Sequence, residues 1–129
     1  MNKFYTNNCS AINLYKKTST RSEIVTQMIY GESFKIINKS AKWIKIRIKE
    51  DGYIGYIKKK QFFLYLKPTH KVSVLCANTY KNSNFKKKIG KLSYVSKIKV
   101  EKTVAKFAKF QSGWIETKNI KPIKYKDKN

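Results

Sequence analysis

The sequence IVTQMIYGESFKIINKSAKWIKIRIKEDGYIGYI, which spans residues 24–57, decides the fold of this chain. Apolar and polar residues alternate over 34–36 and again over 43–48, as they do in strands that bury one face. Gly31 and the Asp51-Gly52 pair separate these runs, and glycine lets the backbone turn tightly at such points. The stretch therefore predicts antiparallel strands joined by tight turns, in a small and strongly curved barrel.

The flanking residues extend this pattern. Residues 11–15 form a short apolar strand before a polar loop at 16–22, and residues 62–66 are apolar enough to be a last strand. Gly55 lies inside the returning strand, where a glycine marks a bulge or the close approach of another backbone. Residues 1–10 are mostly polar, and we expect a lead-in that frays at its end, with Phe4 and Tyr5 as the candidates for pinning it to the barrel.

Several short motifs in this region resemble those of bacterial SH3-like domains. They are Leu14-Tyr15, Thr26-Gln27, Tyr30-Gly31-Glu32, Trp43 and Asp51-Gly52-Tyr53-x-Gly55-Tyr56-Ile57. Within that group, the chain resembles the first SH3-like domain of NlpC-type cysteine peptidases, which cleave γ-D-glutamyl bonds in peptidoglycan-derived peptides. The family pattern ends in Gly-Trp-Ile or Gly-Trp-Val, whereas this chain has a tyrosine at position 56, an aromatic residue that also has a polar tip.

The pattern begins again after a proline-containing segment at 67–71, which we interpret as a linker. Residues 79–81 parallel 14–16, and residues 113–115 parallel 55–57. Such a repeat indicates an internal duplication. The predicted fold is all-β, with two small SH3-like β-barrels in tandem: residues 1–66, the linker 67–71, residues 72–123, and a polar tail at 124–129 that in the family would lead to a catalytic domain.

The second half is predicted in more detail from the first. Residues 72–77 read as one strand, residues 98–100 parallel 34–36, and residues 107–110 correspond to the strand of Trp43. We expect Trp43 and Trp114 to belong to the core and to the packing between barrels, because barrels this small need large side chains inside.

The chain is strongly basic, with a formal net charge of +23. Only Arg21 and Arg47 among the 30 basic residues are arginine, the residue that makes bidentate contacts to phosphates and bases. The chain is also rich in Ile and Asn, whose codons, like those of Lys, are rich in A and T. The lysines therefore indicate a solvated surface shaped by genome composition rather than a specific nucleic-acid site, although they predict salt-sensitive binding to anionic polymers.

No catalytic pair is expected in this chain. NlpC-type peptidases need a Cys nucleophile and a His base, and they carry an Asp-Cys-Ser segment that opens a helix. Asn8-Cys9-Ser10 imitates that segment, but it lacks the Asp and precedes a strand. Cys76 and His70, the only histidine, lie in other parts of the sequence. The chain alone is therefore not expected to be an enzyme, and its two cysteines are expected to be free thiols.

No cofactor or metal is expected either. The histidine, two distant cysteines and seven acidic residues form no cluster with ligand spacing, and there is no glycine-rich phosphate loop. Residues 1–8 lack the apolar segment of a secretory signal, and no apolar run is long enough to span a bilayer. We expect a cytoplasmic protein without a membrane partner.

The resemblance also implies a binding role. In the family, the first SH3-like barrel packs against the catalytic groove and closes one end of it, and an acid and a tyrosine recognise the free N-terminal amine of a peptide that starts with L-Ala. The matching positions are Glu32 and Tyr53, with Asp51 as a second candidate acid. Carboxylate and phenol oxygens can accept hydrogen bonds from an ammonium group. A solvated turn acid and a half-buried strand tyrosine remain the structural alternative.

Three functions stay open on this evidence. The leading hypothesis is the non-catalytic, substrate-gating region of an NlpC-type γ-D-glutamyl peptidase, whose partners are the catalytic domain and a murein-derived peptide. The second is a stand-alone module that binds cell-wall peptides or a protein. The third is a nucleic-acid-binding barrel that acts through lysines and aromatic rings.

Overall fold

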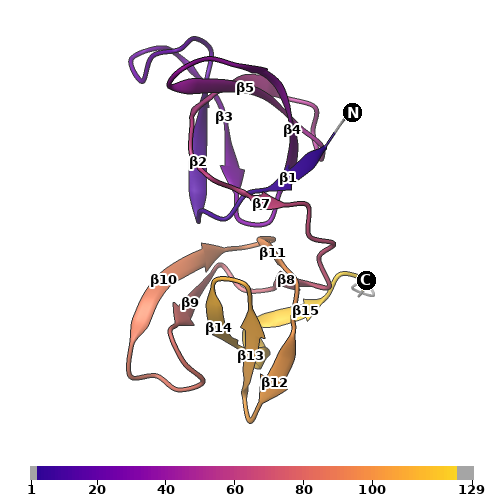
Figure 1. The fold of residues 1–129 in the computed structure, drawn as a ribbon. Coiled ribbons are helices and arrows are strands. Elements are labelled where there is room, and N and C mark those ends of the chain that lie inside the picture. Colours follow the sequence, from indigo (N-terminus) through magenta and orange to yellow (C-terminus); the bar gives the residue numbers. More distant parts are fainter. Residues whose placement is uncertain (1–2, 125–129) are drawn as a thin grey trace. The chain divides into compact units, whose positions relative to one another are not determined.

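The computed structural model describes residues 3–124, which fold into strands joined by turns and contain no α-helix. The chain divides into unit 1, Met1–Leu66, and unit 2, Lys67–Asn129 (Figure 1). One 3-10 turn, η1 at Thr117–Asn119, lies in unit 2. The all-β, SH3-like fold that the sequence predicts is confirmed. Each unit is described separately below.

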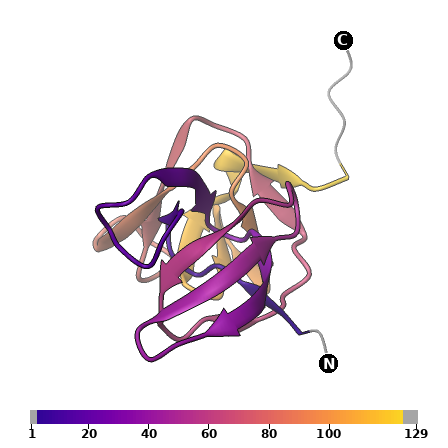
Figure 2. The same cartoon turned by 90° about the horizontal axis from the view of Figure 1, so that it is seen from above.

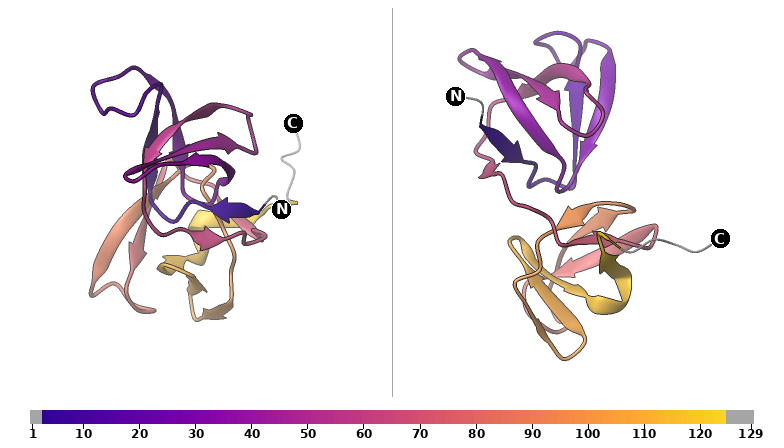
Figure 3. Two further views of the ribbon diagram at one scale, coloured as in Figure 1. Left: turned by 45° about the horizontal axis from the view of Figure 1, so that its top comes forward. Right: turned by 90° about the vertical axis from the view of Figure 1, so that its right-hand side faces the viewer.

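Unit 1 is a curved antiparallel sheet in which neighbouring strands follow the order β3-β2-β6-β5-β4-β1-β7. Figure 2 shows β4 and β5 side by side, and Figure 3 shows the curvature of the whole sheet. The bounds of its strands are β1 Phe4–Thr6, β2 Ala11–Tyr15, β3 Ile24–Ile29, β4 Ser33–Lys39, β5 Trp43–Ile48, β6 Ile54–Lys58 and β7 Phe63–Leu64.

The core of unit 1 is formed by the residues that the alternating pattern marks as apolar. On β5, the buried residues Ile44, Ile46 and Ile48 alternate with the more exposed Trp43, Lys45 and Arg47. These isoleucines pack with four other buried side chains, Leu14, Met28, Phe34 and Ile57. Burial of this apolar surface is what stabilises so small a sheet.

Gly55 has the role that its position predicts. A side chain there would bring its Cβ to 3.0 Å from Leu14 Cβ and 3.1 Å from the carbonyl oxygen of Tyr15. β6 therefore approaches β2 closely at this point, where the two strands pair through Tyr15 and Tyr56. The absence of a side chain at Gly55 allows β6 to pair with β2.

The lead-in predicted for residues 1–10 is held to the barrel at Phe4 and Tyr5, and it contributes the strand β1 rather than a frayed end. Phe4–Thr6 pairs with β4 on one side and with β7 on the other. Asn7 follows, with no solvent exposure. Its Nδ2 donates hydrogen bonds to the carbonyl oxygens of Cys9 at 3.0 Å, Met28 at 3.2 Å and Ile29 at 3.0 Å, and its Oδ1 accepts one from the Cys9 amide at 3.0 Å. The segment is thus bonded into the barrel on both sides.

Unit 2 contains two antiparallel sheets, ordered β10-β9-β14-β13-β12 and β11-β8-β15. Its core consists of apolar side chains such as Val72, Ile98, Phe110 and Ile115. The strands are β8 His70–Val72, β9 Cys76–Tyr80, β10 Lys88–Ser93, β11 Lys97–Ile98, β12 Lys102–Val104, β13 Phe107–Phe110, β14 Gly113–Glu116 and β15 Ile120–Pro122.

The order of the strands repeats between the units. If β9 and β10 are matched with β2 and β3, and β12, β13 and β14 with β4, β5 and β6, the five-stranded sheet of unit 2 has the order of the corresponding strands of unit 1. The closing pair also recurs, because Tyr80 lies opposite Trp114 as Tyr15 lies opposite Tyr56. The topology therefore shows the same internal similarity as the sequence.

Two details of unit 2 differ from the sequence prediction. Residues 72–77 are not one strand, because the chain leaves β8 after Val72 and enters β9 at Cys76, with the side chain of Leu75 87% exposed. The predicted strand at 98–100 is not formed either, because β11 ends at Ile98 and β12 begins only at Lys102. In both places the chain passes from one sheet of the unit to the other.

The tryptophans and the ends of the predicted linker also differ from expectation. Trp43 and Trp114 are half-buried and do not belong to the buried core of the described chain. Within 67–71, the Thr69 amide donates to the carbonyl of Ile98 at 2.9 Å, and His70 begins β8. Of the predicted tail at 124–129, residues 125–129 lie outside the described residues.

His70 should make the stability of unit 2 depend on pH. Burial lowers the pKa of its imidazole from the ordinary value of 6.5, so the unfolded chain binds a proton more readily than the folded one. The resulting stability is complete above pH 6.5 and is lost progressively as the pH falls below it. In a Trp43→Phe background, melting temperatures of unit 2 followed by Trp114 fluorescence should decrease slightly more between pH 7.5 and pH 5 when His70 is present than in His70→Gln. Equal decreases would contradict this expectation.

Candidate functional site

The turn between β3 and β4 positions Glu32. Gly31 adopts a φ of 85°, a conformation that favours glycine, and its amide donates to the carbonyl of Asn7 at 2.9 Å. The half-buried Glu32 turns its carboxylate back, so that Oε1 accepts a hydrogen bond from the Ile29 amide at 2.7 Å. One carboxylate oxygen of Glu32 therefore stabilises the turn between β3 and β4.

The turn between β5 and β6 positions Asp51 and Tyr53. Gly52 has a φ of 78°, and its amide donates to the carbonyl of Ile48 at 2.9 Å. The exposed Asp51 accepts a hydrogen bond on Oδ1 from the Tyr53 amide at 3.0 Å. Tyr53 is 50% exposed, so its phenol group is accessible to a ligand at the surface.

Hydrogen bonds tie these two turns together. The amide of Lys49 donates to the carbonyl of Ser33 at 2.8 Å, and the amide of Ser33 donates to the Glu50 carboxylate at 3.1 and 3.3 Å. Ser33 directly follows Glu32, and Glu50 directly precedes Asp51. The three residues predicted for a site thus lie on two adjoining turns at one edge of unit 1.

Glu50 is the positioning residue that the sequence did not identify. The Glu50-Asp51-Gly52 run predicts a turn, but it does not show that the first carboxylate accepts from the backbone of another hairpin. The contact joins residues 17 positions apart, and no local pattern encodes it. Its effect is to hold the two carboxylate-bearing turns next to each other despite their like charge.

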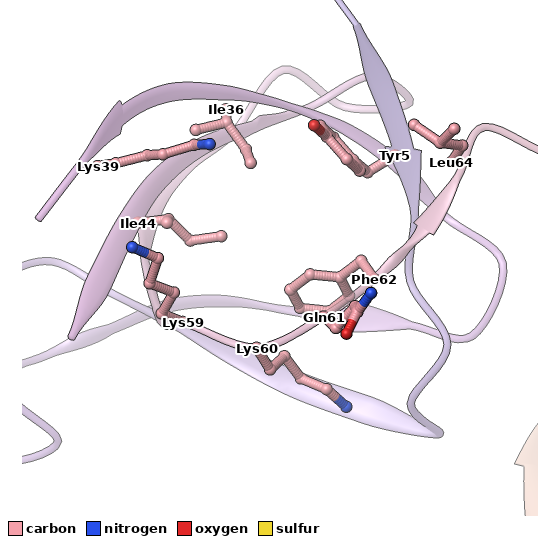
Figure 4. A pocket seen from close by; sticks show the side chains of 9 residues that line it. All are labelled: Tyr5, Ile36, Lys39, Ile44, Lys59, Lys60, Gln61, Phe62 and Leu64. Carbon is pink, nitrogen blue, oxygen red and sulfur yellow. The ribbon is translucent and has the colours of Figure 1, made fainter. Parts of the chain in front are cut away.

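Unit 1 also has a cavity of about 310 Å³ at a different place (Figure 4). None of Glu32, Asp51 and Tyr53 lines it. Its walls come from β1, β4, β5, β7 and the segment between β6 and β7. The residues that line it are Tyr5, Ile36, Lys39, Ile44, Lys59, Lys60, Gln61, Phe62 and Leu64.

The residues considered for cysteine-peptidase chemistry are divided between the two units. Cys9 lies between β1 and β2 in unit 1, where Lys60 Nζ contacts its sulfur, whereas Cys76 and His70 are in unit 2. Both cysteines are free. Across residues 3–124, no three His, Cys, Asp or Glu side chains gather as a metal ion would require, and no helix is long and apolar enough to cross a bilayer.

Comparisons with known proteins agree with this architecture. Residues 14–62, which include most of the strands of unit 1, match the family described as the bacterial dipeptidyl-peptidase SH3 domain. No curated protein matches the chain significantly. The matched residues contain Glu32, Asp51 and Tyr53, so the two adjoining turns belong to the domain that this family describes.

Two solved structures are similar to the chain. An NlpC/P60 family protein from Bacillus cereus superposes with a TM-score of 0.71 at 16% identity, over 92% of this chain and 55% of that one. NlpC2 from Trichomonas vaginalis gives a TM-score of 0.39 at 14% identity, over 98% of this chain and 49% of that one. The chain therefore spans about half the length of these proteins. Residues 14–62 are thus similar to the bacterial dipeptidyl-peptidase SH3 domain, and the fold of the chain is similar to part of an NlpC/P60 family protein.

Proposed function

We propose that this chain is the non-catalytic substrate-recognition and gating region of an NlpC-type cysteine peptidase that cleaves γ-D-glutamyl bonds in peptidoglycan-derived peptides. The match of residues 14–62 to the dipeptidyl-peptidase SH3 domain and the likeness to an NlpC/P60 family protein support this proposal. The catalytic Cys and His would come from the peptidase domain. The region would contribute by selecting peptides with a free N-terminus.

The observation that carries the proposal is the pair of adjoining turns. Tyr53 offers an exposed phenol, Asp51 an exposed carboxylate, and Glu32 a half-buried carboxylate at the same edge of unit 1. An N-terminal ammonium group donates up to three hydrogen bonds, and these are the acceptor types that suit it. An acetylated or longer peptide could not present the same cation in this position, which gives selectivity.

Removal of the Tyr53 hydroxyl should reveal amine recognition. The assay combines the chain with an NlpC-type catalytic domain that lacks its own SH3-like region, and uses L-Ala-γ-D-Glu-diaminopimelate as substrate. Tyr53→Phe and Asp51→Asn should each raise KM about tenfold, as expected for loss of a hydrogen bond to a charged group. Tyr94→Phe, at an equally exposed tyrosine of unit 2, is the matched control and should change nothing.

An N-acetylated form of the same substrate separates amine recognition from a structural effect. It should be cleaved poorly by every variant, with no further loss on Tyr53→Phe. If Tyr53→Phe impairs both substrates equally, or if the chain never alters the catalytic domain, the proposal fails. We further propose that the protein acts in the cytoplasm, which the two free thiols support because disulfides are rare in reducing compartments.

A stand-alone binding module is the second candidate, and an outward aromatic group favours it. Tyr15 and Trp43 contact each other edge to face with ring centroids 6.1 Å apart, and Lys45 Nζ lies 5.8 Å from the ring of Tyr56, which pairs with Tyr15. Half-buried rings on one face are typical of peptide-binding SH3-like grooves. Binding of a cell-wall peptide by this chain alone, abolished by Trp43→Ala, would favour this function over the first.

A further inference from the structure

The cavity in unit 1 has an apolar lining supported by the core. Ile44 is 2% exposed, and Ile36 and Tyr5 are half-buried beside it. Phe62 contacts the fully buried Phe34 with ring centroids 5.0 Å apart, and Tyr5 stacks on the same ring at 5.9 Å. These contacts hold the lining side chains in place, so the cavity is a preformed surface rather than a gap between mobile side chains.

Two ammonium groups stand together at one side of this cavity. Lys39 ends β4 opposite Ile44, and the adjacent Ser40 accepts a hydrogen bond on its carbonyl from Lys59 Nζ at 3.5 Å. The amide of Lys59 is itself bonded to the carbonyl of Lys42 at 2.9 Å, which fixes the segment beside the β4–β5 turn. Figure 4 shows the side chains of Lys39 and Lys59 on the same side of the opening.

The charge of this cavity is not balanced by its own lining. No acidic residue is among the nine that line it. The third cation, Lys60, lies with its Nζ 5.4 Å from the centroid of the Phe62 ring and also contacts the sulfur of Cys9. Lys39 and Lys59 are exposed cations next to a recess that is lined in part by apolar side chains. A ligand that fills the recess and carries a negative charge at its edge would satisfy both features.

We propose that this cavity binds a carboxylate attached to a small apolar group. The apolar group would occupy the space between Tyr5, Ile36, Ile44 and Phe62, and the carboxylate would accept hydrogen bonds from Lys39 and Lys59. The cavity lies at the lower end of the range of about 300–1,000 Å³ typical of small-molecule sites, which fits a single apolar residue better than a larger ligand. The C-terminal residue of a peptide and a short fatty acid share this chemistry.

This site differs from the two adjoining turns in the group that it recognises. The turns offer oxygen acceptors to a cation, whereas the cavity offers ammonium donors to an anion. No residue belongs to both. The inference therefore does not depend on the peptidase proposal, and each can fail without the other.

The experiment is a titration of the whole chain followed by backbone amide chemical shifts. N-acetyl-leucine serves as the peptide-end probe and hexanoate as the fatty-acid probe, with N-acetyl-leucinamide and hexanamide as their neutral counterparts. Binding of a carboxylate probe should shift the amides of residues 36, 39, 44 and 59–62, and the neutral counterpart should shift them much less. The probe with the lower Kd identifies which of the two sources the site prefers.

Charge-matched variants complete the test. Lys39→Gln combined with Lys59→Gln should weaken binding of the carboxylate about tenfold at low salt, because two exposed cations are lost. Lys16→Gln combined with Lys17→Gln removes the same charge from the β2–β3 loop and should leave Kd unchanged. Both pairs are exposed, so folding should be preserved. Equal binding of the neutral probes, or equal weakening by both double variants, would overturn the proposal.

Discussion

Replacement of Asn7 by aspartate is expected to lower the free energy of unfolding of unit 1 by about 3–5 kcal/mol. The Asn7 side chain is fully buried, and its Nδ2 donates to three carbonyl oxygens. In the variant, a carboxylate oxygen would face those oxygens without a proton to share, in a place that water does not reach. The deficit should shrink at low pH, where the protonated carboxyl can donate to one of the three.

Urea unfolding followed by tryptophan fluorescence measures this loss. The chain has two tryptophans, one in each unit, so Trp114→Phe leaves Trp43 as the only reporter of unit 1. Asn13→Asp is the matched control, because Asn13 uses its Oδ1 to accept from Gln27 Nε2 at 3.1 Å and an aspartate can do the same. A loss below about 1 kcal/mol for the Asn7 variant would show that the network is not needed for stability.

Gly113→Ala should destabilise unit 2 by about 3 kcal/mol or more. Gly113 has a φ of 151°, which residues with a side chain rarely adopt. An added Cβ would lie 2.7 Å from the carbonyl oxygen of Tyr80 and 2.8 Å from Ile89 Cδ1. The Tyr80 oxygen belongs to the backbone of β9, so relief of the overlap would separate β14 from its neighbour.

The background for this measurement is Trp43→Phe, in which Trp114 reports on unit 2 alone. Gly90→Ala in the same unit is the control, because its added Cβ would meet only Thr79 Oγ1, at 3.4 Å. The control should lose much less stability than Gly113→Ala. Similar values for the two variants would mean that β9 and β14 can move apart at little cost.

The strand β5 could be predicted because its sequence alternates strictly between apolar and polar residues. On β5, each isoleucine of 43–48 is buried, and the residues between them face outward. The glycines were equally informative. Gly31 and Gly52 mark turns because they adopt positive φ, and Gly55 marks a close approach between strands because a side chain there would overlap with β2. The motifs between Leu14 and Ile57 indicated a resemblance to bacterial SH3-like domains.

What the sequence could not supply are contacts that join distant positions. β1 is three residues long, and Asn7 acquires its importance from carbonyl groups 21 and 22 residues away. The break at Leu75 is hidden within an apolar run, because residues that pass between two sheets can be as apolar as those inside one. The tryptophans were placed in the core on size alone, whereas their strands turn them outward.

The same limits apply to the sites. Glu32, Asp51 and Tyr53 were chosen by resemblance, and the hydrogen bonds from Ser33 and Lys49 explain how two separate turns can act together. The cavity could not be predicted from the sequence, because its lining combines one or two residues from each of four strands with the connecting segment before β7.

The pairing of β2 with β6 joins two parts of unit 1 that are separated in the sequence. The β2–β3 hairpin and the β4–β5–β6 meander each pair strands that are neighbours in the sequence. Tyr15 and Tyr56, which pair β2 with β6, are far apart in the sequence. Loop closure costs entropy before distant contacts can repay it. We therefore expect the pairing of β2 with β6, in which Gly55 packs against Leu14, to be the slow step in folding of the barrel.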